Sequence, residues 1–260
     1  MNEILYFLKF SKKIHLKDFV DGKIYFGNAK LYQEIEEKKK LRGQGDELEA
    51  CTKIFSNNIK MVDNQDKELV TDISGIKIQT ILRFPDADPI PILCLFAVYA
   101  KDCQIDENGI SQIHLSDKTK KAIKRDFPDA DSVGIIRNPK LFIDDIQKSI
   151  SCPIKHGEVH YFKIDKGYVH DKSGQTAIDH DYLMYLMQDT PPIIEGSKKR
   201  YSFNSKYIFR VLFCKDEFFK NEQEYRIVLP DERINTGKTY PVNLSEKIEV
   251  MPIEKFFEEY

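Results

Sequence analysis

The 260-residue sequence lacks the features that mark membrane and secreted proteins. It has no run of about eighteen apolar residues, which is the length a helix needs to cross a bilayer. Its first residues, Met1 to Ile4, show no basic segment of the kind that opens a secretory signal. We therefore expect a cytoplasmic protein with no membrane partner.

Cysteine is scarce and unpatterned, and familiar catalytic motifs are missing. The five cysteines are odd in number and include no Cys-x-x-Cys pair, which argues against a disulfide framework and against a zinc site. We expect reduced thiols, mostly in or near the core. The phosphate-binding Gly-x-x-x-x-Gly-Lys-Ser/Thr loop and the Gly-x-Ser-x-Gly nucleophile elbow do not occur. These absences argue against P-loop and serine-hydrolase chemistry.

The chain does contain enough apolar sequence for a substantial core, with 41% hydrophobic residues. No repeat, low-complexity tract or Gly/Ser-rich linker divides it, so we expect one domain over residues 1–260. The formal net charge is −2. Basic runs at 38–40, 118–125 and 198–200 are interpreted as solvated faces, so binding to nucleic acid is neither required nor excluded.

Periodicity and capping residues predict an α+β protein with a mixed or antiparallel sheet. The predicted strands cover residues 4–10, 23–26, 52–61, 76–84, 92–99, 132–136, 159–164, 207–213, 224–229 and 247–250. Those at 52–61, 76–84 and 92–99 are assigned to a central sheet. The predicted helices cover 11–22, 28–37, 117–126, 139–150, 179–187 and 253–259. Ser11 and Asn28 are the expected N-caps of the first two.

The most informative chemistry is the carboxylate pair Glu222 and Glu224, predicted to open a strand near the C-terminus. Residues two apart on a strand face the same side, so both carboxylates should point one way. Like charges this close disfavour joint ionisation, so the pKa of one glutamate should rise. The alternative is that both glutamates face water at a strand end, paired with Arg226 or a lysine.

This ending resembles the Glu-x-Glu strand of ADP-ribosyltransferases, in which a turn bearing an aromatic residue precedes two glutamates. Phe218 and Phe219 would lie in that turn. The opening strand, helix and strand over residues 4–26 are similar to the segment that frames the nicotinamide pocket in this family. The resemblance implies a split-sheet fold and NAD as a substrate. It further implies a macromolecular acceptor, either protein or nucleic acid, and a role as a bacterial toxin or an anti-phage effector.

The resemblance also assigns roles to the two glutamates. Glu224 would hydrogen-bond the nicotinamide ribose and stabilise the oxocarbenium-like transition state as nicotinamide leaves. Glu222 would orient or deprotonate the acceptor. Phe219 would contact the cofactor from the turn, and Ser205 loosely matches the serine of a supporting strand.

The family places an arginine or histidine on the first strand to hold NAD, and here this sequence departs from the pattern. Residues 4–10 offer only Tyr6 and Lys9. Arg42 or His15 could reach the site from neighbouring elements. Arg42 also belongs to a glycine-containing loop with Asp46 and Glu49, which could clasp a ligand or form a solvated turn.

Two other functions remain open. A non-catalytic binding or regulatory module of similar fold would use the two glutamates structurally. A metal-dependent nuclease would use His156 and His160, which are four residues apart and would share a strand face. No His-Glu-x-x-His motif accompanies them, so we predict no metal site.

Overall fold

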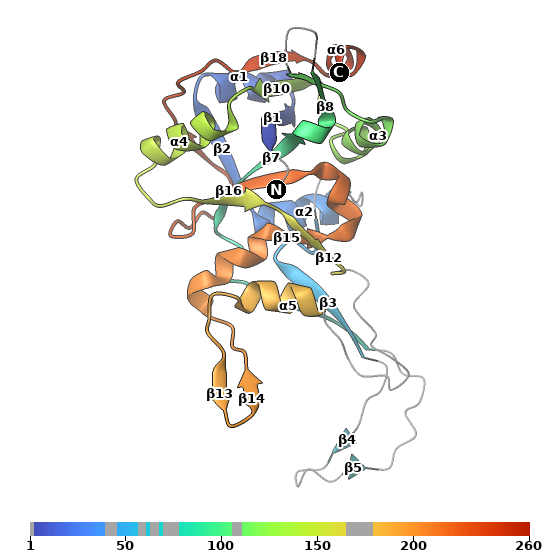
Figure 1. The fold of residues 1–260 in the computed structure, drawn as a ribbon, viewed down its shortest axis with the longest axis vertical. Helices are drawn as coiled ribbons and strands as arrows, with labels where there is room; N and C mark the ends of the chain where they lie inside the picture. The colour runs from blue at the N-terminus through green and yellow to red at the C-terminus, as the bar shows by residue number, and fades with distance from the viewer. Residues whose placement is uncertain are drawn as a thin grey trace.

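The computed structural model describes residues 3–39, 46–56, 61–62, 68–69, 78–105, 111–164 and 179–260. It is an α+β structure built on an antiparallel sheet, as predicted from the sequence (Figure 1). Arg42 lies outside the described residues. Within those residues, no helix combines the length and apolar character that crossing a membrane requires.

The main sheet has the strand order β11-β16-β7-β1-β10-β18, and every neighbouring pair in it is antiparallel. These strands are β1 (Ile4–Ser11), β7 (Pro91–Tyr99), β10 (Ser132–Ile136), β11 (Lys155–Glu158), β16 (Glu224–Val228) and β18 (Glu249–Pro252). Two further strands, β2 (Lys23–Asn28) and β17 (Lys238–Pro241), pair with each other, and β2 also pairs with β7.

The strand β7 is the point at which the sheet branches. One edge of β7 pairs with β16, while the other edge is shared by β1 and β2. Phe96 lies opposite Leu8 of β1, and Ile92 lies opposite Gly27 of β2. Between these pairings, the Nζ of Lys9 donates to the carbonyl of Cys94 at 2.8 Å. A side chain therefore satisfies a backbone acceptor where the two strands part.

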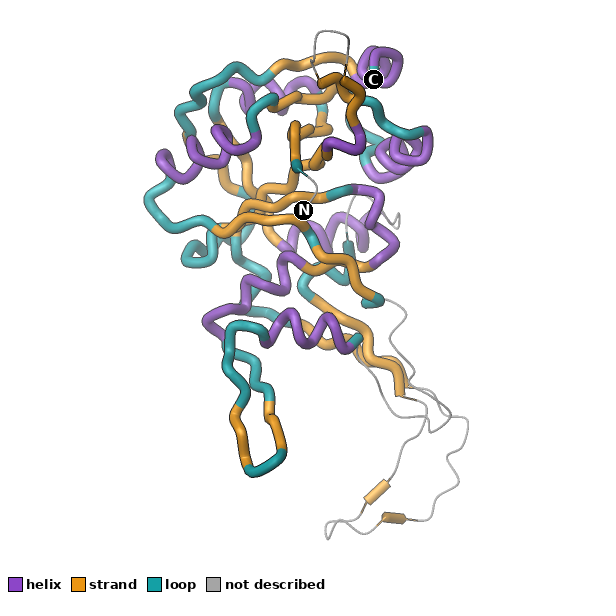
Figure 2. Tube along the Cα trace, in the orientation of Figure 1, coloured by secondary structure: helices purple, strands orange, loops and turns teal. Residues whose placement is uncertain are grey.

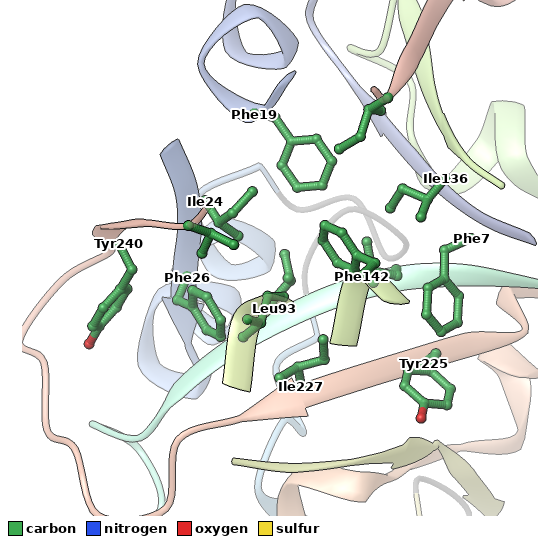
Figure 3. Close-up of a cluster of buried hydrophobic side chains, with 14 of the residues drawn as sticks. Phe7, Phe19, Ile24, Phe26, Leu93, Ile136, Phe142, Tyr225, Ile227 and Tyr240 are labelled. Atoms are coloured by element: carbon green, nitrogen blue, oxygen red, sulfur yellow. The ribbon is translucent and has the colours of Figure 1, made fainter. Parts of the chain in front are cut away.

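One face of the sheet is covered by α1 (Lys13–Val20) and α4 (Pro139–Ser149). Figure 3 shows Phe19 and Phe142 from these helices packed above Phe7, Leu93 and Ile227 of the strands. The helix α4 begins at Pro139, as predicted. Proline lies in its first turn, and the structure adds a cap in which the side chain of Asn138 accepts from the N–H of Leu141. Capping and an apolar stripe together place this helix on the sheet.

The opposite face carries two separate apolar clusters. Around Phe96 and Val98, α3 (Asp117–Asp126) and α6 (Ile253–Glu259) close one end of the sheet. Around Ile92 and Val228, the other end is closed by α2 (Ala29–Lys39), α5 (His180–Met187) and the 3-10 helix η2 (Ser205–Phe213). The strip of sheet between these clusters is where polar side chains appear.

Smaller ribbons surround this body (Figure 2). They are β3 (Cys51–Ser56) with β6 (Ile78–Arg83), β4 (Met61–Val62) with β5 (Glu68–Leu69), β8 (Cys103–Ile105) with β9 (Ser111–Ile113), β12 (His160–Phe162) parallel to β15 (Cys214–Asp216), and β13 (Ile193–Glu195) with β14 (Lys198–Arg200). The remaining 3-10 helices are η1 (Ala100–Asp102) and η3 (Glu217–Glu222). The assignment of 52–61 and 76–84 to the central sheet was wrong, because β3 and β6 pair with each other instead.

Two local predictions were also wrong for identifiable reasons. Residues 207–213 form part of η2 rather than a strand, and its buried residues Ile208, Val211 and Leu212 follow helical rather than alternating spacing. Ser11 is not a helix cap, because β1 continues through it and α1 starts after Lys12 with no side-chain cap. Asn28 does cap α2, accepting from the N–H of Leu31 at 2.9 Å.

Candidate functional site

A pocket of about 110 Å³ opens on the polar strip between the two apolar clusters. A single buried water needs only about 10–15 Å³, so the pocket has room for part of a ligand. It is lined by residues from β1, β7, β16, α2, the loop before β3, the C-terminal end of α3, β15 and η3: Leu8, Lys9, Phe10, Tyr32, Asp46, Glu49, Cys94, Leu95, Phe96, Phe127, Lys215, Glu222, Glu224 and Arg226.

Both glutamates of the predicted pair line this pocket, but they do not share a strand. Glu222 ends η3, Gln223 adopts a left-handed conformation at φ +43°, and β16 begins at Glu224. The two carboxylates nevertheless converge, since Glu222 Oε2 and Glu224 Oε2 accept from Lys215 Nζ at 2.5 and 3.0 Å. The predicted convergence is confirmed, while the strand alternation invoked to explain it was wrong for Glu222.

The turn at Gln223 is held by its own hydrogen bonds. Its carbonyl accepts from the N–H of Ala97 at 2.8 Å, and its Nε2 donates to Ala97 O and Asp102 Oδ2, both at 3.0 Å. A left-handed conformation costs about 1–2 kcal/mol for a residue with a Cβ, and these bonds offset that cost. The turn therefore directs Glu222 back toward Lys215.

Arg226 anchors Glu224 from the other side. Its guanidinium is 1% exposed. It donates to Glu224 at 2.6 Å and 3.2 Å, to Glu49 at 2.5 Å and 2.8 Å, and to the carbonyl of Leu212 at 2.5 Å. The alternative considered for these glutamates was that they face water, paired with Arg226 or a lysine. The pairing is present, but Glu222 and Glu224 are only 5% and 6% exposed, so they do not face water.

The pKa values of the two glutamates are pushed in opposite directions, as the like-charge argument predicted for one of them. Burial, together with the charge of Glu224, raises the pKa of Glu222 to about 8 despite Lys215. Burial acts on Glu224 in the same sense, but Arg226 and Lys215 outweigh it and hold the pKa of Glu224 below its usual range. At neutral pH, Glu224 is ionised and Glu222 is largely protonated.

Lys215 is the residue that sequence reasoning missed. It lies 4.3 Å above the ring of Phe219, and burial would lower its pKa. The two glutamates reverse this effect, so the pKa of Lys215 is raised and the ammonium stays charged. No local periodicity marks this lysine in the sequence. Its role depends on β15 lying beside η3.

The loop residues Asp46 and Glu49 also line the pocket, so for these two the interpretation as a solvated turn was wrong. They are 3% and 1% exposed. Burial and the nearby Glu49 raise the pKa of Asp46 to about 7. The pocket therefore holds four carboxylates and three cations, counting Lys9, Lys215 and Arg226.

The structure separates the proposed NAD-holding residues. Lys9 lines the pocket, whereas Tyr6 packs within the apolar cluster around Phe96 and is not among the lining residues. Phe219 is fully buried beneath Lys215 and does not line the pocket either. The aromatic walls are instead Phe10, Tyr32, Phe96 and Phe127.

Ser205 and His15 lie away from the pocket. Ser205 starts η2 in an exposed position, and His15 is exposed on α1. Neither is among the lining residues. The supporting role expected of Ser205 therefore has no counterpart in the pocket geometry.

Metal and thiol chemistry find no support in the described residues. His156 Nδ1 lies 2.6 Å from the hydroxyl of Tyr225, and the ring of His160 packs 4.4 Å from that of Tyr185. Across the described ranges, no three His, Cys, Asp or Glu side chains are arranged to hold a metal ion. Burial raises the pKa of the Cys94 thiol to about 12, so this pocket cysteine is not a thiolate at neutral pH.

All five cysteines are free, as expected.

Comparison with known proteins finds no family model, no curated protein and no solved structure that matches this chain. Function is therefore inferred from the geometry and chemistry of the pocket.

Proposed function

We propose that this protein cleaves NAD at the nicotinamide glycosidic bond and transfers ADP-ribose to a macromolecular acceptor. The observation that carries the proposal is the pair Glu222 and Glu224, which meet on one lysine in a pocket with their pKa values pushed apart. Two carboxyl groups in different protonation states are the arrangement that separates a charge stabiliser from a proton acceptor.

Glu224 is suited to stabilise a cation. As nicotinamide departs, positive charge develops on the ribose, and an ionised carboxylate fixed beside it lowers the barrier. A carboxylate has about four acceptor positions, of which Arg226 and Lys215 occupy three. The remaining position is open to the weak thiol donor of Cys94 or to a ribose hydroxyl.

Glu222 is suited to accept a proton. Only its Oε2 is bonded to Lys215, and its raised pKa makes the ionised form a stronger base than an ordinary glutamate. It would take the proton from the acceptor as the new glycosidic bond forms at ribose C1′. Nicotinamide leaves with the electron pair of the broken bond, so charge and atoms balance.

The walls fit one end of a dinucleotide. The aromatic side chains Phe10, Phe96 and Phe127 offer an apolar surface for a flat ring. The ammonium of Lys9, which gives one hydrogen bond to Cys94, keeps two N–H donors for an oxygen atom of the nicotinamide end. A pocket of about 110 Å³ would take the nicotinamide end, leaving the rest of NAD outside.

The test is nicotinamide release from NAD, with cell extract as a source of acceptor. Wild type should release nicotinamide, and Glu224→Gln should lower the rate by about 100-fold or more, because the charge that meets the cation is lost. Glu49→Gln is the matched control. It also breaks a buried ion pair of Arg226, but the proposed mechanism gives Glu49 no role in the reaction, although Glu49 lines the pocket. We expect it to retain the rate within about tenfold.

Both variants should be checked for folding, since removing one partner of a buried pair destabilises by about 3–5 kcal/mol. Equal losses of activity in the two variants would mean that the network supports the pocket rather than the reaction. Absence of nicotinamide release from folded wild type would contradict the proposal.

A second candidate is a non-catalytic module that binds a polar ligand in the same pocket. It is favoured by the saturation of Arg226, whose donors are all directed to Glu224, Glu49 and Leu212. A network this complete could serve stability alone. Binding of NAD without nicotinamide release would support this candidate.

A further inference from the structure

The hairpin formed by β13 and β14 stands out from the body of the protein (Figure 1). Every residue from 191 to 206 is exposed. Its two strands are joined at Gly196 and Ser197, and Gly196 has φ +61° with open space around it. The hairpin is therefore available to a partner along its whole length.

Its composition differs from that of an ordinary solvated turn. Ile193 and Ile194 are 53% and 68% exposed, and Tyr201 and Phe203 beside them are 44% and 39% exposed. These are four of the eight large apolar side chains found exposed in the described residues. Apolar side chains gathered on a projecting element indicate a contact surface.

The same hairpin concentrates positive charge. Lys198, Lys199 and Arg200 are consecutive, and Lys206 follows, while Glu195 is the one acidic residue between 190 and 206. Arg200 pairs with Glu195 at 3.1 Å. Within the described part of the chain, neither Lys198 nor Lys199 forms an ion pair. This local excess of cations contrasts with the net charge of −2 for the whole chain.

The strand register places the exposed apolar side chains next to the cations. Ile194 lies opposite Lys199, and Ile193 lies opposite Arg200, so each face of the ribbon presents an isoleucine beside a cation. Tyr201 continues directly from the basic run. Cations that meet phosphates, next to an aromatic ring on which a base can stack, are what nucleic-acid-binding surfaces use. A two-stranded ribbon also fits the grooves of a duplex.

We propose that the β13–β14 hairpin is a nucleic-acid-binding arm, in which Lys199 meets a phosphate from one face of the ribbon, Lys198 and Arg200 meet phosphates from the other, and Tyr201 stacks on a base. A membrane surface fits less well, because the tip of the hairpin is Gly196-Ser197 and carries no apolar side chain. Binding by the arm is independent of the NAD chemistry. Its consequence, that the ADP-ribose acceptor is nucleic acid, rests on the proposed function.

The test is fluorescence anisotropy of the full chain with a labelled single-stranded oligonucleotide, as DNA and as RNA, over about 50–200 mM salt. The triple variant Lys198→Ala, Lys199→Ala, Arg200→Ala should bind at least about tenfold more weakly. Its slope of log affinity against log salt should fall by about 2, since each phosphate contact on a single strand contributes about 0.7.

The matched control replaces three exposed lysines on helices, Lys118, Lys121 and Lys140, by alanine. It removes the same charge and should change affinity by less than about twofold. Tyr201→Ala should weaken binding by about fivefold or more without changing the salt slope, because stacking does not release counterions.

Equal weakening in the triple variant and the control would overturn the proposal, as would absence of binding by wild type. So would equally tight binding to polyglutamate, because that would indicate an acidic protein partner. Nicotinamide release measured on the same preparations separates the two proposals. The triple variant should keep the wild-type rate without acceptor, whatever the outcome for the oligonucleotide.

Discussion

Glu222 and Glu224 differ through their partners rather than through their chemistry. Glu224 has two cations, Arg226 and Lys215, whereas Glu222 has Lys215 alone. In a buried site, this difference of one cation is enough to leave one carboxylate ionised and the other protonated. The proposed division of roles follows from it.

This division predicts a pH dependence for the transfer step. The base is the ionised form of Glu222, so transfer to the acceptor should rise with pH to a midpoint near 8. Glu224 stays ionised over this range, so nicotinamide release to water should be flat from about pH 6 to 9. Rates of transfer and release, measured separately with labelled NAD, check this expectation.

Glu222→Gln supplies the control, since glutamine cannot accept the proton. In this variant, the rate of transfer to the acceptor should no longer rise with pH, whereas the rate of nicotinamide release should be unchanged. A variant that transfers ADP-ribose with an unchanged pH profile would show that Glu222 is not the base.

At the scale of elements, the passage from α1 into β2 depends on one glycine. Gly22 has φ +76°, and a Cβ there would lie 2.1 Å from the carbonyl oxygen of Val242. The carbonyl of Gly22 also accepts from the N–H of Val242 at 2.7 Å. The chain just after β17 can pair closely here because Gly22 has no side chain.

Gly22→Ala should therefore lower the free energy of unfolding by about 3 kcal/mol, from the left-handed conformation and the clash together. Gly196→Ala is the matched control, because Gly196 has a similar φ of +61° but open space around it. It should lower the free energy of unfolding by no more than about 1–2 kcal/mol. Urea denaturation checks both values, and equal effects would mean that the contact with Val242 is easily relieved.

At the scale of the whole molecule, Arg226 joins distant parts of the chain. Its partner Glu49 is 177 residues away, and its other partner, Glu224, is two residues away. This guanidinium links the loop before β3 to the strand β16, so the pocket and the fold share one set of buried charges. Stability and activity should therefore respond to the same groups.

The titrations of Glu222 and Asp46 should lower stability as pH rises from about 5 to 8. Glu222 and Asp46 have folded-state pKa values of about 8 and about 7, above their usual 4.5 and 3.8, so the folded protein holds protons that the unfolded chain has released. Each group then lowers the free energy of unfolding by at most about 1.4 kcal/mol per pH unit. The lowered pKa of Glu224 adds no slope in this range, because Glu224 is ionised in both states.

Urea denaturation at several pH values measures this slope. Glu222→Gln lacks one of the two titrations, so its free energy of unfolding should fall less steeply with pH. The difference between the variant and wild type should therefore shift in favour of the variant as pH rises. Parallel curves for the two proteins would show that the folded state does not raise the pKa of Glu222.

The sequence by itself determined the features that depend on near neighbours. The cap at Asn28 and the apolar strands β1, β7 and β10 were predicted correctly, because a cap or a short apolar run spans only a few residues. The proximity of the Glu222 and Glu224 carboxylates was also predicted from their spacing, although the strand alternation used to explain it was wrong for Glu222.

Only the tertiary structure decided how that pair is arranged. Lys215 lies only seven and nine positions before the glutamates, but it meets both only in the folded chain, and Glu49 meets Arg226 across 177 positions. The left-handed turn at Gln223 is stabilised by Ala97 and Asp102, which lie more than a hundred positions earlier. Burial and long-range pairing, which set the pKa values, arise only when the chain has folded.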